Sequence, residues 1–444
     1  MDENDESFSF LDSEPSLMDM SISYYRKEKK KKTKKKLIIL LSFLSLCVII
    51  EYFTRETLKK SSIKFFGSKK NKRCELLEKF DFYNYSGRYI LLFFILNYVN
   101  LYAAIGFIFL DMLSVALSGI INFFYLEPRP FWEDANLKPC HCDLEYTGAS
   151  TTGTQIFIIL ISFYRFITYK TKEKFRNDFI LIICSLIIIL MYLIRLLQNL
   201  IYLNQIIFGL CIGFSIYYWF FNIVKVDCYN RKQFKQIINQ PILVFSMLII
   251  FWVLFNIIHV NINLNIKPIY ILNIQKYCKK EIFNSLDFNM YTKSMIFFEF
   301  LGCYLGIYLE YKIIFKENID LFIRYNIKSK YNELFNKTSK FKSFIRFLMF
   351  YLLEIIIFKN IFPYNYKISN NLFENYSFMF QIFLLFFITI FKGIFFFFIL
   401  KRMIIYLKLT NEKIHQVMIN KRQDSLVSNY KEDEEIIINN EEQN

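Results

Sequence analysis

Two arginines stand where this chain could clamp a phosphate group. Arg129 lies between prolines in residues 127–132 (EPRPFW), a stretch that predicts a rigid turn after a long apolar segment. Arg195 lies near the end of a later apolar segment, and the small residues 148–154 (GASTTGT) lie between the two. Arginine side chains at a membrane rim, close to a short polar turn, supply the donors that a phosphate group needs. The alternative is that each arginine only extends from a helix end towards water.

The composition of the chain places these fragments in a membrane protein. Hydrophobic residues make up 55% of it, whereas glycine and proline number only 11 and 7. Apolar stretches of about 20 residues recur, and each is long enough to cross a bilayer. We therefore expect an all-α fold, a polytopic membrane helical bundle of about ten spans. The net charge of +16 flanks the apolar segments, which favours a topology signal and membrane lipids as partners, with no nucleic acid.

The apolar segments also predict where the spans lie. The first is expected at residues 37–53, directly after the lysine-rich residues 27–36, an order that favours an uncleaved signal anchor. Residues 89–126 are too long for one span, so we divide them near residues 97–100 into two helices. Further spans are expected at residues 152–169, 178–199, 203–224, 241–261, 293–314, 343–363 and 376–400.

Four regions follow from this pattern. Residues 1–36 are acidic and then basic, and we expect a disordered cytosolic tail. Residues 37–224 would form a six-span membrane core, and residues 225–401 an additional four-span bundle. Residues 402–444 would form a second cytosolic tail with an acidic end.

Charge in the connectors orients the expected spans. With the amino terminus in the cytosol, the basic connectors fall on the cytosolic side, as does the carboxyl terminus. Residues 54–88 are the exception, since they are basic yet expected in the lumen. The fragments around Arg129, residues 148–154 and Arg195 all fall together on the lumenal side, which favours one shared site. We expect an integral protein of the endoplasmic reticulum or another endomembrane.

Residues 122–213 resemble the type-2 phosphatidic acid phosphatase superfamily, and within it the glucose-6-phosphatase and lipid phosphate phosphatase branch. That superfamily carries the blocks Lys-x6-Arg-Pro, Pro-Ser-Gly-His and Ser-Arg-x5-His-x3-Asp. In this chain residues 122–130, 151–154 and 194–205 occupy the three blocks. Gln205 in place of the last aspartate, with Gly209 four residues on, is similar to the glucose-6-phosphatase variant. The resemblance implies that the first six expected spans have the phosphatase arrangement.

The same resemblance implies a degenerate catalytic set. Superfamily members use the third-block histidine as the nucleophile and the second-block histidine as the general acid. Here Ile201 replaces the nucleophile, Thr154 the acid and Asn122 the first-block lysine, and an isoleucine has no lone pair with which to attack phosphorus. The residues that remain for phosphate binding are Arg129, Thr152, Gly153, Arg195 and Gln205.

One histidine could still replace those that are missing. His141 lies in residues 140–142 (CHC), within the same expected lumenal loop, although a solvated loop histidine is the simpler interpretation. Either neighbouring cysteine could form a disulfide with Cys74 or Cys278. The loop offers too few ligands for zinc, and we expect no metal and no cofactor.

Ionisable residues within other expected spans favour a second class of function. Asp111, Glu299, Glu354 and Lys392 are costly at membrane depth and should face the interior of the bundle. Such residues form either an ion or substrate path or a buried polar contact that fixes helix packing.

These observations predict a catalytically degenerate, phosphatase-like pseudoenzyme. It would bind a phosphorylated lipid or a small phosphorylated metabolite, or regulate an active partner. One alternative is an active phosphomonoesterase that uses a displaced histidine. The other is a membrane transporter or channel without phosphate chemistry.

Overall fold

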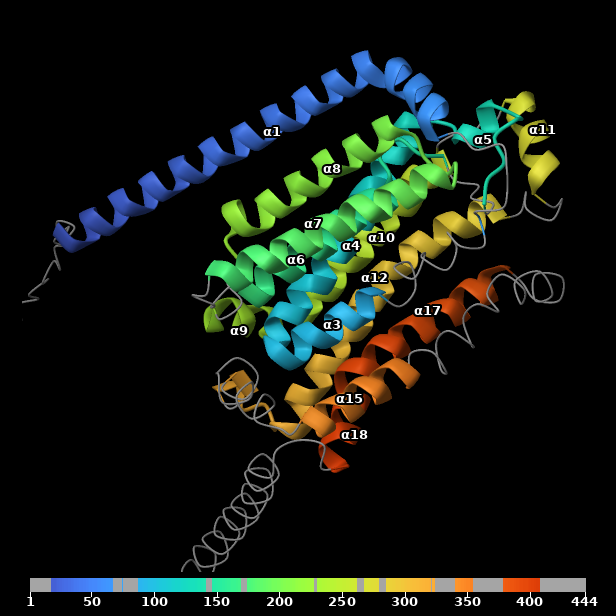
Figure 1. Ribbon diagram of the computed structural model, residues 1–444. Helices are drawn as coiled ribbons and strands as arrows, with labels where there is room; N and C mark the ends of the chain where they lie inside the picture. Colours follow the sequence, from blue (N-terminus) through green and yellow to red (C-terminus); the bar gives the residue numbers. More distant parts are fainter. Residues whose placement is uncertain are drawn as a thin grey trace, which may run out of the picture.

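The computed structural model is a bundle of helices (Figure 1). It describes residues 17–66, 74, 87–140, 146–168, 174–226, 230–261, 267–278, 285–320, 322–323, 340–353 and 378–407. Every regular element in these ranges is a helix, and the single β-bridge found there joins Glu127 to Thr147, so the all-α class is confirmed.

The described helices are those of an integral membrane protein. Four of them are long and apolar enough to cross a membrane, and a fifth span is added if a bent helix pair counts as one. The count of about ten spans stays a prediction, because several expected spans fall partly outside the described residues.

Helix α1 (Leu17–Phe66) is far longer than the expected first span. The part of the tail from Leu17 onward, which we expected to be disordered, is helical, and so is the start of the expected connector at residues 54–66. The physical reason is that residues 16–66 contain no proline or glycine, while lysine and glutamate are good helix formers. Large apolar side chains in the middle of α1, such as those of Ile38 and Phe53, are exposed, as lipid-facing residues would be.

The expected break near residues 97–100 is confirmed. Helix α3 (Gly87–Tyr98) is followed by α4 (Leu101–Tyr125), and Asn100 caps the second helix because its Oδ1 accepts the amide of Ala103 at 2.7 Å. After α4, Pro128 and the short helix α5 (Pro130–Glu133) form the expected turn.

The first half of the chain ends with helices α6 (Thr151–Thr168), α7 (Lys174–Leu197) and α8 (Leu203–Tyr218), and α8 continues as the π-helix η3 (Trp219–Val224). Helix α7 runs antiparallel to α6 and α8. Helix α1 runs antiparallel to α8. The amide of Leu203 donates to Ser62 Oγ at 2.8 Å at one end, and Lys36 Nζ donates to the carbonyl of Asn222 at 3.3 Å at the other.

These contacts define two ends of the bundle. The end that holds Ser62, the end of α4 and the starts of α6 and α8 is called the site end below. The opposite end is called the basic end, and it holds Lys36 and α9 (Arg231–Asn239). Tyr102, at the start of α4, also lies there, because its hydroxyl group donates to Gln233 at 3.0 Å. Figure 1 shows α5 and α9 at these opposite ends.

The second half of the chain packs against the first half. Its helices are α10 (Pro241–Asn261), α11 (Pro268–Tyr277), α12 (Ser285–Leu309) with η5 (Glu310–Ile314), α15 (Lys340–Leu353), α17 (Phe378–Ile394) with η7 (Phe395–Ile399), and α18 (Leu400–Tyr406). One continuous apolar cluster includes residues from both halves, and the rings of Phe109 in α4 and Phe300 in α12 lie 5.7 Å apart. The described part of the expected additional bundle therefore shares a core with the first.

Helices α12 and α17 cross at backbone contact. A Cβ atom on Gly302 would lie 2.2 Å from the carbonyl oxygen of Ile390, and one on Gly393 would lie 2.4 Å from the amide nitrogen of Cys303. Such close approach needs small residues on both helices. Beyond the crossing, the buried Glu310 accepts from Lys401 Nζ at 2.8 Å and from Arg402 Nη2 at 2.9 Å.

Three of the four ionisable residues that we expected inside the bundle lie within the described residues. Asp111 is buried, as expected, and accepts from Gln155 Nε2 at 2.6 Å. Glu299 and Lys392 are half-buried. Glu354 lies outside the described residues.

Candidate functional site

Asn122, at the position of the first-block lysine, organises the second block. Its Oδ1 accepts the amides of Gly148 and Ala149, both at 2.9 Å, and its Nδ2 donates to Thr151 Oγ1 at 3.1 Å. A lysine could not accept these two bonds, because its ammonium group only donates. Asn122 therefore has a structural role at this position, in contrast to the phosphate-binding role that the resemblance implies for a lysine.

A short bridge holds the first and second blocks together. The backbone groups of Glu127 and Thr147 exchange two hydrogen bonds of 2.8 Å each. Gly148 follows at once, and a Cβ atom there would lie 2.3 Å from that of Tyr125. The small-residue stretch thus packs directly on the end of α4, where a side chain would not fit.

The second block is also bonded to the third. The amide of Ser150 donates to the carbonyl of Gln205 at 2.9 Å, and Thr154 Oγ1 lies 3.1 Å from the carbonyl oxygens of both Ser150 and Gly209. Gly209 permits this contact, since a Cβ atom on it would lie 2.9 Å from the oxygen of Ser150. The starts of α6 and α8 therefore touch where the motif spacing requires it.

The side chain of Arg129 and the backbone of Arg195 contact the same residue of the third block. Arg129 Nη1 donates to the carbonyl of Leu200 at 2.9 Å, while the amide of Leu200 donates to the carbonyl of Arg195 at 3.4 Å. The two arginines are only 5% and 4% exposed. The three blocks, separated in the sequence, thus meet at the site end.

The expected phosphate donors of the second block are engaged within the protein. The amide of Gly153 donates to Ser150 Oγ at 3.0 Å, which caps the start of α6. Thr152 is half-buried, and the Oε1 atom of Gln205 accepts the amide of Tyr202 at 3.0 Å. The amides of Gly153 and Tyr202 are thus satisfied within the protein.

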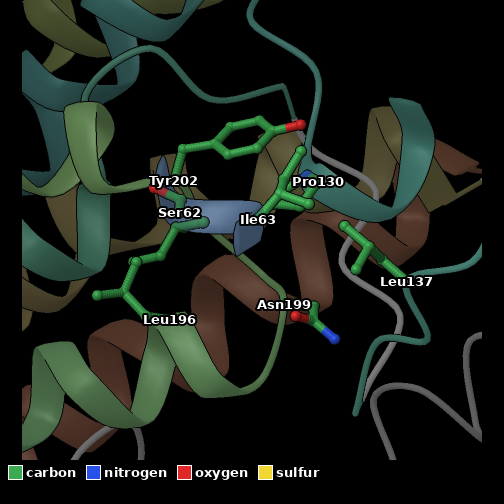
Figure 2. Close-up of a pocket in the computed structure, with 8 residues that line it drawn as sticks. Ser62, Ile63, Pro130, Leu137, Leu196, Asn199 and Tyr202 are labelled. Atoms are coloured by element: carbon green, nitrogen blue, oxygen red, sulfur yellow. The ribbon is translucent and has the colours of Figure 1, made fainter. Parts of the chain in front are cut away.

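Ile201, which the resemblance aligns with the nucleophile, lines a small pocket, and other residues of the pocket lining are labelled in Figure 2. The pocket has room for about one water molecule. Side chains of α1, α5, the end of α7 and the start of α8 line it, among them those of Ser62, Pro130 and Tyr202. Thr154 is fully buried and its hydroxyl group is bonded to carbonyl oxygens, so neither replaced position carries a nucleophile or a proton donor for hydrolysis.

The cysteine pairing is confirmed in part. Cys74 and Cys140 form a disulfide, one of the expected alternatives, and Cys278 is also disulfide-bonded. The proposed replacement histidine, His141, lies outside the described residues. Within the described ranges, no group of three or more His, Cys, Asp or Glu side chains is placed to hold a metal ion.

Helix α1 contributes residues to the site that the sequence analysis missed. Glu51, Arg55, Lys59 and Ser62 follow one another at spacings of four, four and three, so they lie on one face of the helix. Arg55 donates to both carboxylate oxygens of Glu51, at 2.8 and 2.7 Å. This spacing could have identified the polar face of α1 from the sequence. It was overlooked because residues 37–53 were interpreted as an anchor and residues 54–88 as a connector.

Glu127 is the centre of the resulting charge cluster. Its side chain is 1% exposed and lies 3.1 Å from Lys59 Nζ and 3.1 Å from Asn204 Nδ2. Arg55 Nε lies 4.0 Å away. Burial raises the pKa of Glu127, and the contacts with Lys59, Gln205 and Asn204 oppose this shift.

Lys59 is held from three sides. Besides Glu127, its Nζ atom lies 3.5 Å from Glu133 Oε1 and 5.2 Å from the centre of the Tyr202 ring. The hydroxyl group of Tyr202 donates to Glu133 Oε2 at 2.6 Å. Burial raises the pKa of Tyr202, so this hydroxyl group stays protonated and keeps donating.

An aromatic cap covers the turn that carries Arg129. Phe131 and Trp132 are fully buried, and the Trp132 ring lies 5.0 Å from that of Tyr146. Helix α11 packs on this cap, where Asn273 Nδ2 donates to the carbonyl of Trp132 at 2.7 Å. The second half of the chain therefore helps to fix the first block.

No family model, curated protein or solved structure matches this chain. The site is therefore interpreted from its own chemistry. The cations, amides and hydroxyl groups that meet here can donate to an anion, while the neighbouring carboxylates of Glu127 and Glu133 accept from several of them.

Proposed function

We propose that this chain is a catalytically degenerate relative of the type-2 phosphatidic acid phosphatases, a pseudoenzyme that binds a phosphorylated lipid or small metabolite without hydrolysing it. The observation that carries this proposal is the meeting of three separated motif segments at the site end. Asn122 bonds the first segment to the second, Ser150 the second to the third, and Arg129 the first to the third.

The chemistry of the replaced positions argues against hydrolysis. A superfamily phosphatase needs a nucleophile and a proton donor on opposite sides of the phosphorus. Ile201 offers only hydrocarbon, and the Thr154 hydroxyl group is bonded to carbonyl oxygens. Loss of both groups removes the catalytic unit rather than weakening it.

The retained arginines support binding. The side chain of Arg129 donates to the carbonyl of Leu200, and both arginines are almost fully buried at the site end, where their guanidinium groups can donate to a phosphate. The basic segments lie at the opposite end, so the site end would face the lumen of the endoplasmic reticulum or another endomembrane compartment, with both termini in the cytosol. A ligand-dependent effect on an active partner enzyme fits the same site.

The experiment uses the full-length protein in lipid nanodiscs. Phosphate release from phosphatidic acid and from sugar phosphates should stay at the background level. Calorimetry with a short-chain phosphatidic acid should detect binding, and Arg129→Ala and Arg195→Ala should each weaken it by roughly 1.5–3 kcal/mol. Arg231→Ala, an exposed arginine at the basic end, is the matched control and should leave the affinity unchanged.

Two outcomes would contradict the proposal. Robust turnover would show an active phosphomonoesterase, and loss of that turnover in His141→Ala would assign a displaced catalytic histidine. Binding that neither arginine affects, or no binding at all, would instead favour the transporter or channel, whose path would involve buried charges such as Asp111 and Glu310.

A further inference from the structure

The α1 charge cluster, defined as Glu51, Arg55, Lys59, Glu127, Glu133 and Asn204, has an uneven pairing. Arg55 is bonded twice to Glu51 and is thereby largely satisfied within its own helix. Lys59 is shared between two carboxylates on other elements, Glu127 and Glu133. Its side chain is 10% exposed, so the cluster holds an ammonium group in a largely dry place.

Lys59 lies beside the pocket that Ile201 faces. Ser62 and Ile63, one turn further along α1, line that pocket together with Pro130 (Figure 2). Tyr202 contacts both the pocket and Lys59, because its side chain lines the pocket and its ring lies under the Lys59 ammonium group. The pocket itself has room for about one water molecule, so an anion larger than water could be held only beside it, where the Lys59 ammonium group contacts Glu127.

The position that the superfamily pattern gives to a lysine cannot supply this charge. Asn122 is neutral, and both ends of its side-chain amide are bonded to the small-residue stretch. Asn204, at the start of α8, directs its Nδ2 atom at both oxygens of Glu127, at 3.1 and 3.2 Å. Asn204 Nδ2 also donates to Glu51 Oε1 at 3.2 Å, so the donors that a phosphate would need are present, and carboxylates of the protein, Glu127 foremost, occupy them.

We infer that Lys59 and Asn204 form an anion site for a phosphate monoester, and that the carboxylate of Glu127 occupies it in the ligand-free protein. This inference rests on the proposed function and names two of its binding residues. The ligand would replace Glu127 on Lys59 Nζ and Asn204 Nδ2. No covalent step is involved.

A ligand that takes Lys59 and Asn204 from Glu127 leaves the Glu127 carboxylate buried without these two partners. The ligand's own contacts must offset the free-energy cost of that loss. A proton on Glu127 would lower that penalty, and burial already shifts the pKa of this carboxyl group upward. The charged, titratable or polar groups around it are Glu51, Arg55 and Lys59 of α1, Tyr125 of α4, Glu133 of α5, and Asn204 and Gln205 of α8. Binding should therefore strengthen as the pH falls.

The first test measures the affinity of full-length protein in nanodiscs for inorganic phosphate. Glu127→Gln removes the competing charge and should tighten binding by about 10-fold or more, as expected for a charge-assisted bond. Lys59→Met should weaken binding by about 10-fold, and Lys59→Arg should restore most of it. Glu317→Gln and Lys60→Met, at exposed positions, are the matched controls and should leave the affinity unchanged.

The second test uses the pH dependence. Inorganic phosphate itself changes its charge between about pH 5 and 8, so sulfate, whose charge is constant, is the probe over this range. Sulfate binding to the unaltered protein should strengthen as the pH falls, while Glu127→Gln should give a flatter profile. If Glu127→Gln does not fold, Glu127→Asp withdraws the carboxylate by one methylene and should shift the affinity in the same direction.

The outcomes separate this inference from the proposed function. If phosphate binding depends on Arg129 and Arg195 but not on Lys59 or Glu127, the function stands and the inference is wrong. If neither the unaltered protein nor Glu127→Gln binds phosphate or sulfate, the proposed function fails with it. Tighter binding to Glu127→Gln than to the unaltered protein supports both.

Discussion

Ile201 and Thr154, which the phosphatase resemblance aligns with catalytic histidines, differ in their surroundings. Ile201 borders a small pocket, so a different side chain there has some room. Thr154 is fully buried between α6 and α8, and its hydroxyl group lies 3.1 Å from the carbonyl of Gly209. A larger side chain at this position would push the two helices apart. The general-acid position is therefore harder to restore than the nucleophile position.

This difference leads to a prediction about restored hydrolysis. Ile201→His alone should remain inactive on phosphatidic acid, because no proton donor stands at position 154 and catalytic groups act as a unit. Asn122→Lys, Thr154→His and Ile201→His together give the best chance of phosphate release, measured by a single-turnover assay with radiolabelled substrate. Hydrolysis by Ile201→His alone would mean that another group already supplies the proton.

Restoring the lysine should also affect stability. Asn122→Lys removes both acceptor contacts to the amides of Gly148 and Ala149, and each buried amide left unsatisfied costs about 1–3 kcal/mol. We expect a clearly lower thermal midpoint for Asn122→Lys than for Ile201→His, measured by the unfolding of detergent-purified protein. Equal midpoints would show that the loop finds other acceptors.

At the scale of elements, the crossing of α12 and α17 depends on glycine. Gly393→Ala should destabilise the protein by about 1–3 kcal/mol, because the new methyl group would overlap the backbone at Cys303. Gly106→Ala is the matched control, since its methyl group would meet only ring edges, of Phe166 at 3.3 Å and of Phe220 at 3.5 Å. Thermal unfolding in detergent compares the two variants, and equal loss in both would contradict the packing argument.

The sequence predicted some elements well and others poorly. The break before α4 was predictable because Asn100 interrupts an apolar run and is a strong N-cap residue. The length of α1 was not predicted, because hydropathy alone marks only the apolar span. The helix continues beyond this span into lysine-rich segments. The contribution of Lys59 to the site could not follow from the motif blocks, because it comes from a helix that precedes all of them.

At the scale of the whole molecule, charge and disulfide chemistry are separated along the bundle. Lys36 and α9 lie at the basic end, while the disulfide between Cys74 and Cys140 joins the loop that follows the aromatic cap at the site end. A disulfide persists in an oxidising compartment, and basic connectors stay in the cytosol. Both signals predict the same orientation, with the site end in the lumen and the basic end in the cytosol.

This orientation yields the last prediction. In sealed microsomes, an epitope tag at the amino terminus should be digested by added protease, because we expect that terminus in the cytosol. After reduction with a permeable thiol, Cys74 and Cys140 should react with a membrane-impermeant maleimide only once detergent opens the vesicles. A Cys140→Ser variant provides the control for labelling, and loss of the disulfide should lower stability by about 2–4 kcal/mol. A protected tag, or labelling of both cysteines in sealed vesicles, would reverse the orientation, because the basic end would then face the lumen. The arginines, Lys59 and Glu127 would in that case face the cytosol, and their ligand would have to be a cytosolic phosphate compound.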